Sequence, residues 1–148
     1  MNRGEKAVSL FESGCNCAQA VAVAFCDVMG LTPEQAAKLS SGFGGGMGRM
    51  REVCGAVSGM VMVLGAVDGY DRAGDDEIKM KLYQKVQTLA GEFRSQQGTI
   101  ICRELLDNPP SDPNPSPRTA EYYAKRPCAR MVLLAGQILD DYIKENPL

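Results

Sequence analysis

The chain has 148 residues, a formal net charge of -2, and 45% hydrophobic, 23% charged and 6% aromatic residues. This composition is typical of a globular protein, and the length favours one domain over residues 1–148, with a core large enough to form without metal or disulfide staples. Because the chain contains no histidine, histidine-containing zinc sites and imidazole bases are excluded. With 16 basic and 18 acidic residues and no run of Lys or Arg longer than two, it also lacks the charge pattern of a nucleic-acid-binding protein.

The N-terminal segment is charged and no apolar stretch follows it, so the sequence predicts no secretory signal and a cytoplasmic location. The longest apolar run, residues 53–67, is shorter than the ~20 residues that a membrane helix needs, so no direct membrane insertion is expected. This run, which contains three glycines, is instead expected to form a buried central helix. In a reducing cytosol the six cysteines should stay thiols unless they react or bind metal.

Hydrophobic periodicity is helical along nearly the whole chain, which predicts an all-α, single-domain helical bundle. A first helix is expected over residues 3–12, ending before Gly14. A second helix should begin after Asn16, which forms a capping box with Gln19, and end near Gly30.

The later elements follow from caps, glycines and prolines. Thr32 and the proline after it predict a short helix over residues 33–39. A long amphipathic helix is expected over residues 75–97. Its apolar face should contain Ile78, Leu82, Val86, Leu89 and Phe93. Five of the eight prolines fall within residues 107–117, which predicts an extended surface loop, and the last helix should begin at Pro127.

Four cysteines fall at or beside predicted helix starts: Cys17, Cys54, Cys102 and Cys128. For Cys102 the expected cap is Thr99. A helix N-terminus carries about half a positive charge and unpaired N–H groups, which favour a thiolate, so the pKa values of these four thiols are expected to be lowered. A thiolate serves both as a nucleophile in disulfide exchange and as a ligand for soft metals, and position alone leaves both chemistries open.

The other two cysteines have weaker claims to function. Cys26 falls in mid-helix, where a free cysteine packs as a small hydrophobe. Cys15 lies just before the second helix, and its position favours neither packing nor chemistry.

A glycine loop, residues 42–48, precedes the central helix. It does not fit a dinucleotide or P-loop pattern, which argues against nucleotide binding. Gly44, Gly45, Gly46 and Arg49 are expected to bind an anion through backbone N–H groups and a guanidinium. The alternative is that these glycines only permit a tight turn.

Two further features surround Cys54. Glu52 is placed to accept a thiol proton, although it also fits an exposed carboxylate at a helix start. Gly55 and Gly59 form a small-x-x-x-small pattern, which would let another helix approach Cys54 closely.

Several of these motifs resemble one family. They are Asn16-Cys17-Ala18-Gln19-Ala20-Val21, the glycine loop, Cys54-Gly55-Ala56-Val57-Ser58-Gly59, Cys102-Arg103-Glu104-Leu105-Leu106 and Cys128. Together they resemble, over most of the chain, the redox-active proteins named for a C, GCAxxG, C, C pattern. The resemblance implies a small, largely helical bacterial or archaeal protein, with Cys17, Cys54, Cys102 and Cys128 as its signature cysteines. It also implies a functional link to a transporter. Because a related module is similar to part of a multidomain cytochrome, it keeps iron–sulfur ligation open.

The leading hypothesis is a thiol redox protein whose four signature cysteines converge and cycle between dithiol and disulfide with an unidentified redox partner. Cys54 is the expected attacking thiol, with Glu52 as its proton acceptor. The alternative is a binding module in which Cys17, Cys54, Cys102 and Cys128 hold an iron–sulfur cluster or zinc. A third hypothesis is a helical partner-binding domain with incidental cysteines.

Overall fold

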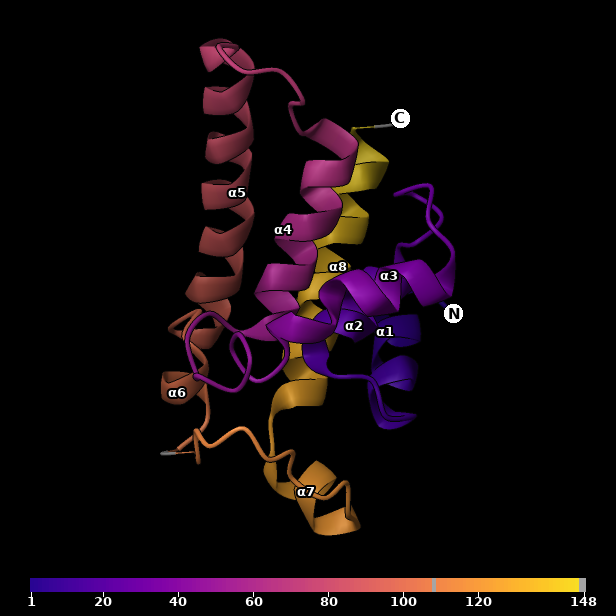
Figure 1. Ribbon diagram of the computed structural model, residues 1–148, viewed down its shortest axis with the longest axis vertical. Coiled ribbons are helices and arrows are strands. Elements are labelled where there is room, and N and C mark those ends of the chain that lie inside the picture. The colour runs from indigo at the N-terminus through magenta and orange to yellow at the C-terminus, as the bar shows by residue number, and fades with distance from the viewer. Residues whose placement is uncertain (108, 147–148) are drawn as a thin grey trace.

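The computed structural model describes residues 1–107 and 109–146, so position 108 of the expected proline-rich loop and the last two positions of the expected domain lie outside the described residues. Within them the chain forms eight α-helices, and its β pairing is limited to an isolated antiparallel bridge between Val53 and Ile101 (Figure 1). The helices are α1 (Arg3–Glu12), α2 (Cys17–Ala24), α3 (Pro33–Ser40), α4 (Gly55–Asp68), α5 (Asp76–Gln97), α6 (Cys102–Leu105), α7 (Ala120–Lys125) and α8 (Cys128–Glu145), with a 3-10 turn, η1 (Ser41–Phe43), after α3. The all-α prediction is confirmed.

The predicted caps of α2 and α3 are both present. The Asn16 side chain accepts a hydrogen bond of 2.9 Å from the Gln19 amide, and the Gln19 side chain accepts one of 3.0 Å from the Asn16 amide. Thr32 and Gln35 form the same reciprocal pair. Each box satisfies two N–H groups that a helix start leaves unpaired, and so fixes the first residue of its helix.

Helix α2 ends at Ala24, earlier than the predicted end near Gly30. From Phe25 onward the backbone bonds tighten, because the amides of Phe25 and Cys26 donate to carbonyls three residues back. Gly30, with φ 72°, then lets the Leu31 amide donate back to the Cys26 carbonyl, which closes the segment. The glycine marks the end of this turn region rather than of the helix.

The starts of α6 and α7 also differ from expectation. Thr99 does not cap α6: Ile101 directly precedes the helix, and the Thr99 hydroxyl accepts a hydrogen bond of 3.1 Å from the Ile101 amide. The sequence did not predict α7, although Thr119 caps it by accepting from the Tyr122 amide. This helix carries aromatic side chains to the site described below.

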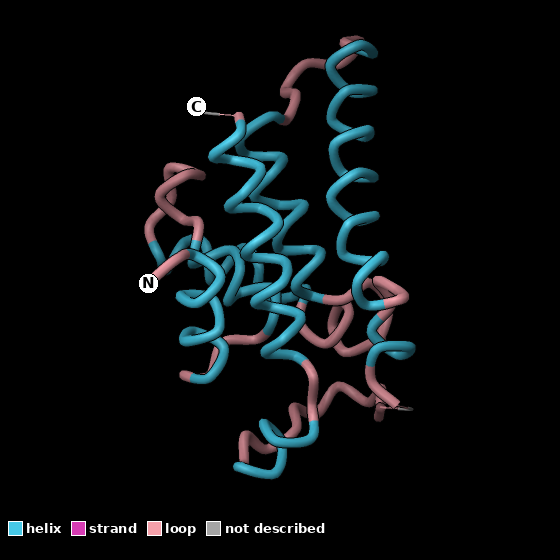
Figure 2. Tube along the Cα trace, turned by 180° about the vertical axis from the view of Figure 1, so that it is seen from behind, coloured by secondary structure: helices cyan, strands magenta, loops and turns pink. Residues whose placement is uncertain are grey.

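Helices α4 and α8 lie side by side through the middle of the molecule, with α5 along one side and α1, α2 and α3 on the other (Figures 1 and 2). Helix α4 packs against α2, α5 and α8. Its buried residues are Gly55, Ala56, Val57, Gly59, Met60, Val63 and Leu64. The predicted buried, glycine-containing central helix is therefore confirmed. None of the helices in the described residues is long and apolar enough to cross a membrane.

The expected apolar face of α5 is buried only in its second half. Leu89 and Phe93 are buried, whereas Ile78 is 42% exposed, so its predicted burial is wrong. The first turns of α5 extend beyond the end of α4 (Figure 1), and the apolar side chains of Ile78 and Met80 on these turns are exposed.

Two helix crossings need glycine because backbones touch there. A Cβ atom at Gly59 would lie 2.9 Å from the Ala18 carbonyl oxygen on α2. A Cβ at Gly136 would lie 2.7 Å from the Gly4 Cα, where α8 crosses α1. The approach predicted from the small-x-x-x-small pattern is thus present between α4 and α2.

Replacing Gly136 with Ala should therefore destabilise the protein relative to Gly91→Ala, the matched control. Gly91 lies in α5, and a Cβ there would meet no atom within 4 Å, so its replacement should only add helix propensity. The difference in the free energy of unfolding between the two variants is expected to be about 1–3 kcal/mol, the usual cost of overpacking. Urea denaturation measures it, and equal unfolding free energies would contradict the close crossing.

Candidate functional site

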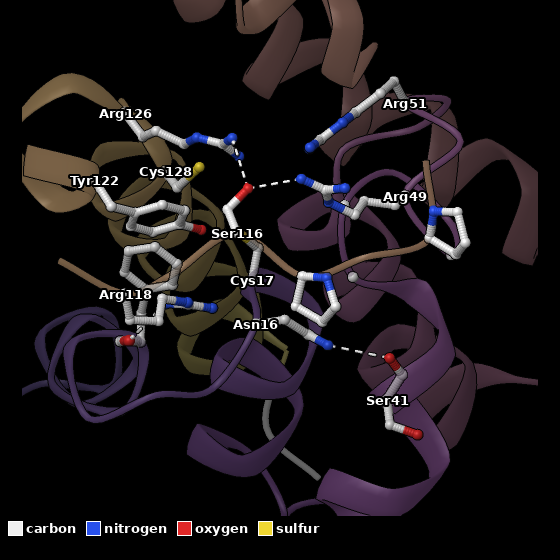
Figure 3. A pocket seen from close by; sticks show the side chains of 16 residues that line it. Asn16, Cys17, Ser41, Arg49, Arg51, Ser116, Arg118, Tyr122, Arg126 and Cys128 are labelled. Carbon is white, nitrogen blue, oxygen red and sulfur yellow. Dashed lines mark hydrogen bonds between the residues drawn. The ribbon is translucent and has the colours of Figure 1, made fainter. Parts of the chain in front are cut away.

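A cavity of about 300 Å³ opens where the starts of α2 and α8 meet the glycine loop, α7 and the proline-rich loop (Figure 3). We call it the arginine pocket. Its lining includes Asn16, Cys17, Gly44, Gly45, Gly48, Arg49, Arg51, Ser116, Arg118, Tyr122, Arg126 and Cys128. No carboxylate of the described residues lines it.

Each of the four predicted site cysteines lies at a helix start, as the sequence indicated. Cys17, Cys102 and Cys128 are the first residues of α2, α6 and α8, and Cys54 is the residue directly before α4. Cys54, Cys102 and Cys128 are buried, Cys17 is partly buried, and all four belong to the main apolar cluster. Negative charge on any of the other three raises the pKa of Cys17, which means that the four sulfur atoms lie near one another.

Cys17 and Cys128 form the pair that faces the arginine pocket. Their thiols lie within hydrogen-bonding reach of each other, and both line the cavity. Gly55 makes this arrangement possible, because a Cβ there would lie 3.3 Å from the Cys17 Cβ and 3.1 Å from the Ala18 amide nitrogen. The start of α4 therefore packs directly behind Cys17.

Cys54 and Cys102 are brought together by the isolated β-bridge. The Cys54 amide donates to the Ile100 carbonyl at 2.8 Å, and the Cys102 amide donates to the Glu52 carbonyl at 2.6 Å. Each cysteine directly follows one of the bridged residues, Val53 or Ile101, and negative charge on Cys102 raises the pKa of Cys54, so the two thiols lie near each other. Sequence periodicity gave no signal for this short pairing.

The pKa of Cys128 is lowered to about 7, first by the hydrogen bond from Cys17 and then by the positive charges of Arg126, Arg118 and Arg51. Burial opposes this shift but does not cancel it. At neutral pH about half of this thiol is therefore ionised. Cys17, as the hydrogen-bond donor, keeps its proton, and its pKa is raised.

The predicted lowering of the pKa is wrong for the other three thiols. Burial raises the pKa of Cys54 to about 12, although the amides of Ala56 and Val57 favour its thiolate. Burial also raises the pKa of Cys102, against the effect of Arg51. For Cys17 the hydrogen bond to Cys128 is the largest cause. A helix start alone does not ionise a thiol that is cut off from water.

The glycine loop forms a coil that is held by its own backbone hydrogen bonds. The amides of residues 47–49, 51 and 52 donate to carbonyls of residues 42–46, so Gly44, Gly45 and Gly46 take part as acceptors. Gly44 and Gly45 line the pocket together with Arg49. Gly46 packs instead against Cys102, where a Cβ would lie 2.7 Å from the Cys102 Cβ. Anion binding by the N–H groups of these glycines stays a prediction.

The pocket arginines of this segment are held in unusual backbone conformations. Arg49 and Arg51 have φ values of 67° and 61°, a region that side-chain-bearing residues seldom adopt. Arg49 donates hydrogen bonds of 2.6 Å to the Asp112 carbonyl and the Ser116 hydroxyl. Arg51 donates to the Pro110 carbonyl at 2.9 Å and to the Cys102 sulfur at 3.7 Å. These bonds hold the proline-rich loop over the pocket.

Glu52 lies outside this arrangement. Its carboxylate is about half exposed and pairs with the Arg103 guanidinium at 3.2 Å. The alternative interpretation of Glu52, an exposed carboxylate, agrees with this position. A role as proton acceptor for Cys54 has no support in the geometry.

Three contributors to the pocket were not identified from the sequence: Ser116, Arg118 and Tyr122. The Tyr122 ring lies between two guanidiniums, with Arg118 and Arg126 each 4.8 Å from its centroid. Arg118 also lies 4.8 Å from the Phe11 ring and donates to the Cys15 carbonyl at 3.1 Å. The sequence pattern, a tyrosine with an arginine on either side of it, is a weak signal for a site. These side chains come together only when α7 packs against α1.

The two remaining cysteines differ in their surroundings, because Cys15 packs against the same main apolar cluster as the four and Cys26 does not. Cys26 is buried in a small separate apolar cluster with Ala22, Val23 and Ala36, which agrees with the packing interpretation. Cys15 is partly exposed, and burial raises its pKa. All six cysteines are free thiols.

A zinc ion or an iron–sulfur cluster would need the four thiolates arranged around one centre. In the described part of the chain, no three Cys, Asp or Glu side chains are placed to hold one metal ion. Cys17 is instead paired with Cys128, and Cys102 with the fixed positive charge of Arg51. The donor set in this arrangement does not fit either group.

The fold and the site together define an all-α protein whose cysteines gather at helix starts beside an arginine-lined pocket, as expected of a protein that works through its thiols. Residues 15–142 match the family described as "Putative redox-active protein (C_GCAxxG_C_C)", and the chain belongs to this family. The resemblance drawn from the motifs is thus confirmed. No curated protein and no solved structure matches the chain significantly.

Replacing Cys17 with Ala should raise the pKa of Cys128 above its value of about 7, because the thiolate loses its hydrogen bond. Cys17→Ser, which keeps a hydroxyl donor, is the matched control and should shift the pKa less. The rate of iodoacetamide alkylation at Cys128, followed against pH by peptide mass spectrometry, measures this pKa. A lowered pKa puts the half-maximal rate at lower pH, near 7 for the unmodified chain. Superimposable pH profiles for the chain and Cys17→Ala would refute the pairing.

Proposed function

We propose that this protein is a thiol-disulfide redox protein in which Cys128 attacks and Cys17 resolves. The observation that carries the proposal is the hydrogen-bonded Cys17–Cys128 pair at the arginine pocket, with the pKa of Cys128 lowered to about 7. A thiol with a pKa near ambient pH is the best attacking group in disulfide exchange, because it combines ionisation with nucleophilicity.

The reaction needs two steps. The Cys128 thiolate attacks an electrophilic sulfur of the substrate, forms a mixed disulfide with it, and expels the substrate's leaving group with the bonding electron pair. The Cys17 thiol then loses its proton and attacks the Cys128 sulfur, which releases the substrate's sulfur as a thiolate. Two electrons pass from the two cysteines to the substrate, and a Cys17–Cys128 disulfide remains.

This assignment moves the attacking role from Cys54, the residue that the sequence favoured. Cys54 does not line the pocket, and burial raises its pKa to about 12, so at neutral pH it is a protonated, enclosed thiol. Cys128 has the three nearby guanidiniums that lower its pKa. Access and charge both favour Cys128.

Cys54 and Cys102 serve in this proposal as a second dithiol behind the first. They directly follow the two bridged residues, and both lie near the Cys17–Cys128 pair. Exchange between the pairs would reduce the first and oxidise the second, with no net change in electrons. Return to four thiols requires a reductant, such as a dithiol partner protein. Six free thiols suit a reducing compartment such as the cytoplasm.

Mild oxidation with diamide is expected to produce a Cys17–Cys128 disulfide in the intact chain. Mass spectrometry of peptides from non-reduced digests identifies the bond. Cys17→Ser and Cys128→Ser should each abolish it, whereas Cys26→Ser, the control in a separate apolar cluster, should leave its yield unchanged.

The same experiment discriminates between the hypotheses. Absence of any disulfide that contains Cys128 would overturn the proposal, as would anaerobically purified protein that binds stoichiometric zinc or iron through the four thiolates. Metal analysis with thiol counting therefore accompanies the oxidation. Metal-free, folded protein with four titratable site thiols supports the thiol chemistry.

A further inference from the structure

One buried polar group of the arginine pocket has no partner. The Arg51 side chain lines the cavity and the residue is only 3% exposed, yet among the described residues its Nη2 atom has no hydrogen-bond acceptor. Leaving a buried charged donor without an acceptor is unfavourable, and native proteins seldom do so unless a ligand or water completes the site. Its other two nitrogens are bonded to the Pro110 carbonyl and the Cys102 sulfur, so the guanidinium is held in place.

The pocket also carries uncompensated positive charge. Four arginines line it, and in the described part of the chain only Arg49 has a carboxylate partner, the half-exposed Asp112. Arg51, Arg118 and Arg126 bond instead to carbonyls, a hydroxyl, a thiol sulfur or aromatic rings. Neutral acceptors satisfy hydrogen bonds but do not neutralise charge, so the cavity attracts anions.

The guanidiniums approach the cavity from different sides. In Figure 3, Arg49, Arg51 and Arg126 all point inward, and the Ser116 hydroxyl lies between Arg49 and Arg126. That oxygen accepts hydrogen bonds of 2.6 Å from Arg49 and 3.4 Å from Arg126. One flat carboxylate is matched by a single arginine fork, whereas donors that converge from several directions match the three oxygens of a tetrahedral group.

We propose that the arginine pocket binds a small tetrahedral oxyanion group, and that Arg51 Nη2 and Arg126 are its principal donors. Since Cys128 lines the same cavity, and resting on the function proposed above, the substrate class is an organic thiosulfate (an S-sulfonate), R–S–SO₃⁻. In such a molecule the electrophilic sulfur is bonded directly to the sulfonate. Arginines that hold the sulfonate would therefore present this sulfur to Cys128.

The reaction balances with the two cysteines as the reductant. The Cys128 thiolate attacks the sulfur that carries R, the S–S bond to the sulfonate breaks, and sulfite leaves with the electron pair. Cys17 then displaces R–S⁻, which takes up a proton. Overall, one organic thiosulfate and two cysteine thiols give one R–SH, one hydrogen sulfite and one Cys17–Cys128 disulfide. The arginines stabilise the negative charge that builds up on the leaving sulfite.

Sulfate binding to Cys128→Ser tests the anion site without any thiol chemistry at that position. Isothermal titration at constant ionic strength should show saturable binding of sulfate. Adding Arg51→Met or Arg126→Gln should weaken it about tenfold or more, because each removes a charge-assisted hydrogen bond. Arg130→Gln, an exposed charge change two residues from Cys128 and outside the pocket lining, is the matched control and should change the dissociation constant by less than about twofold.

The two parts of the inference fail separately. No sulfate binding would overturn the anion site, even if Cys17 and Cys128 form a disulfide. Equal losses of sulfate affinity in Arg126→Gln and Arg130→Gln would overturn it as well. If Arg51→Met does not fold, Arg126→Gln keeps this test decisive.

A second experiment tests the substrate class. The reduced chain is mixed with S-sulfocysteine or with cystine, and the released sulfite and thiol are measured. Faster reaction with S-sulfocysteine, lost in Arg126→Gln, supports the class, and equal rates would overturn it.

Discussion

Close backbone approach at the helix starts is the constraint on which the site depends. The start of α4 packs against the first turn of α2 because Gly55 has no side chain, and the glycine loop packs against Cys102 because Gly46 has none. Larger residues at either position would push a cysteine away from its neighbours. Four thiols from segments far apart in sequence are thus brought together by this packing and by the backbone hydrogen bonds of the β-bridge.

Once the thiols are together, burial and charge compete for their protons. The field of a helix start contributes about 0.3–1 kcal/mol at typical sites, less than the about 1.4 kcal/mol that corresponds to one pKa unit. Burial alone can move a pKa by about 3–5. Cys54, where burial dominates, therefore stays protonated although it lies at a helix start, whereas Cys128 gains a hydrogen bond and three positive charges. The hydrogen bond from Cys17 together with the arginines, rather than the helix ends, selects the reactive thiol.

The sequence could predict what depends on local interactions. The capping boxes at Asn16 and Thr32 and the helix-start positions of the four cysteines follow from short-range hydrogen bonding, and the structure has them. The early end of α2 and the whole of α7 depend on tertiary contacts that periodicity does not record. The same holds for the positions of Arg118 and Tyr122, which meet Phe11 and Cys128 only after the chain has folded back on itself. For this reason the burial of each thiol could not be predicted from the sequence.

The backbone conformation of the arginine segment links stability to function. Positive φ values at Arg49 and Arg51 each cost about 1–3 kcal/mol, and such strain persists only where surrounding contacts enforce it. Here the enforcing contacts are the coiled hydrogen bonds of the glycine loop and the carbonyls of Asp112 and Pro110. These contacts leave the guanidinium of Arg51 without a counter-charge, and the counter-charge of Arg49 is the half-exposed Asp112 carboxylate. The fold therefore uses part of its stability to keep positive charge concentrated beside Cys128, where that charge lowers the thiol pKa and where an anionic substrate would bind.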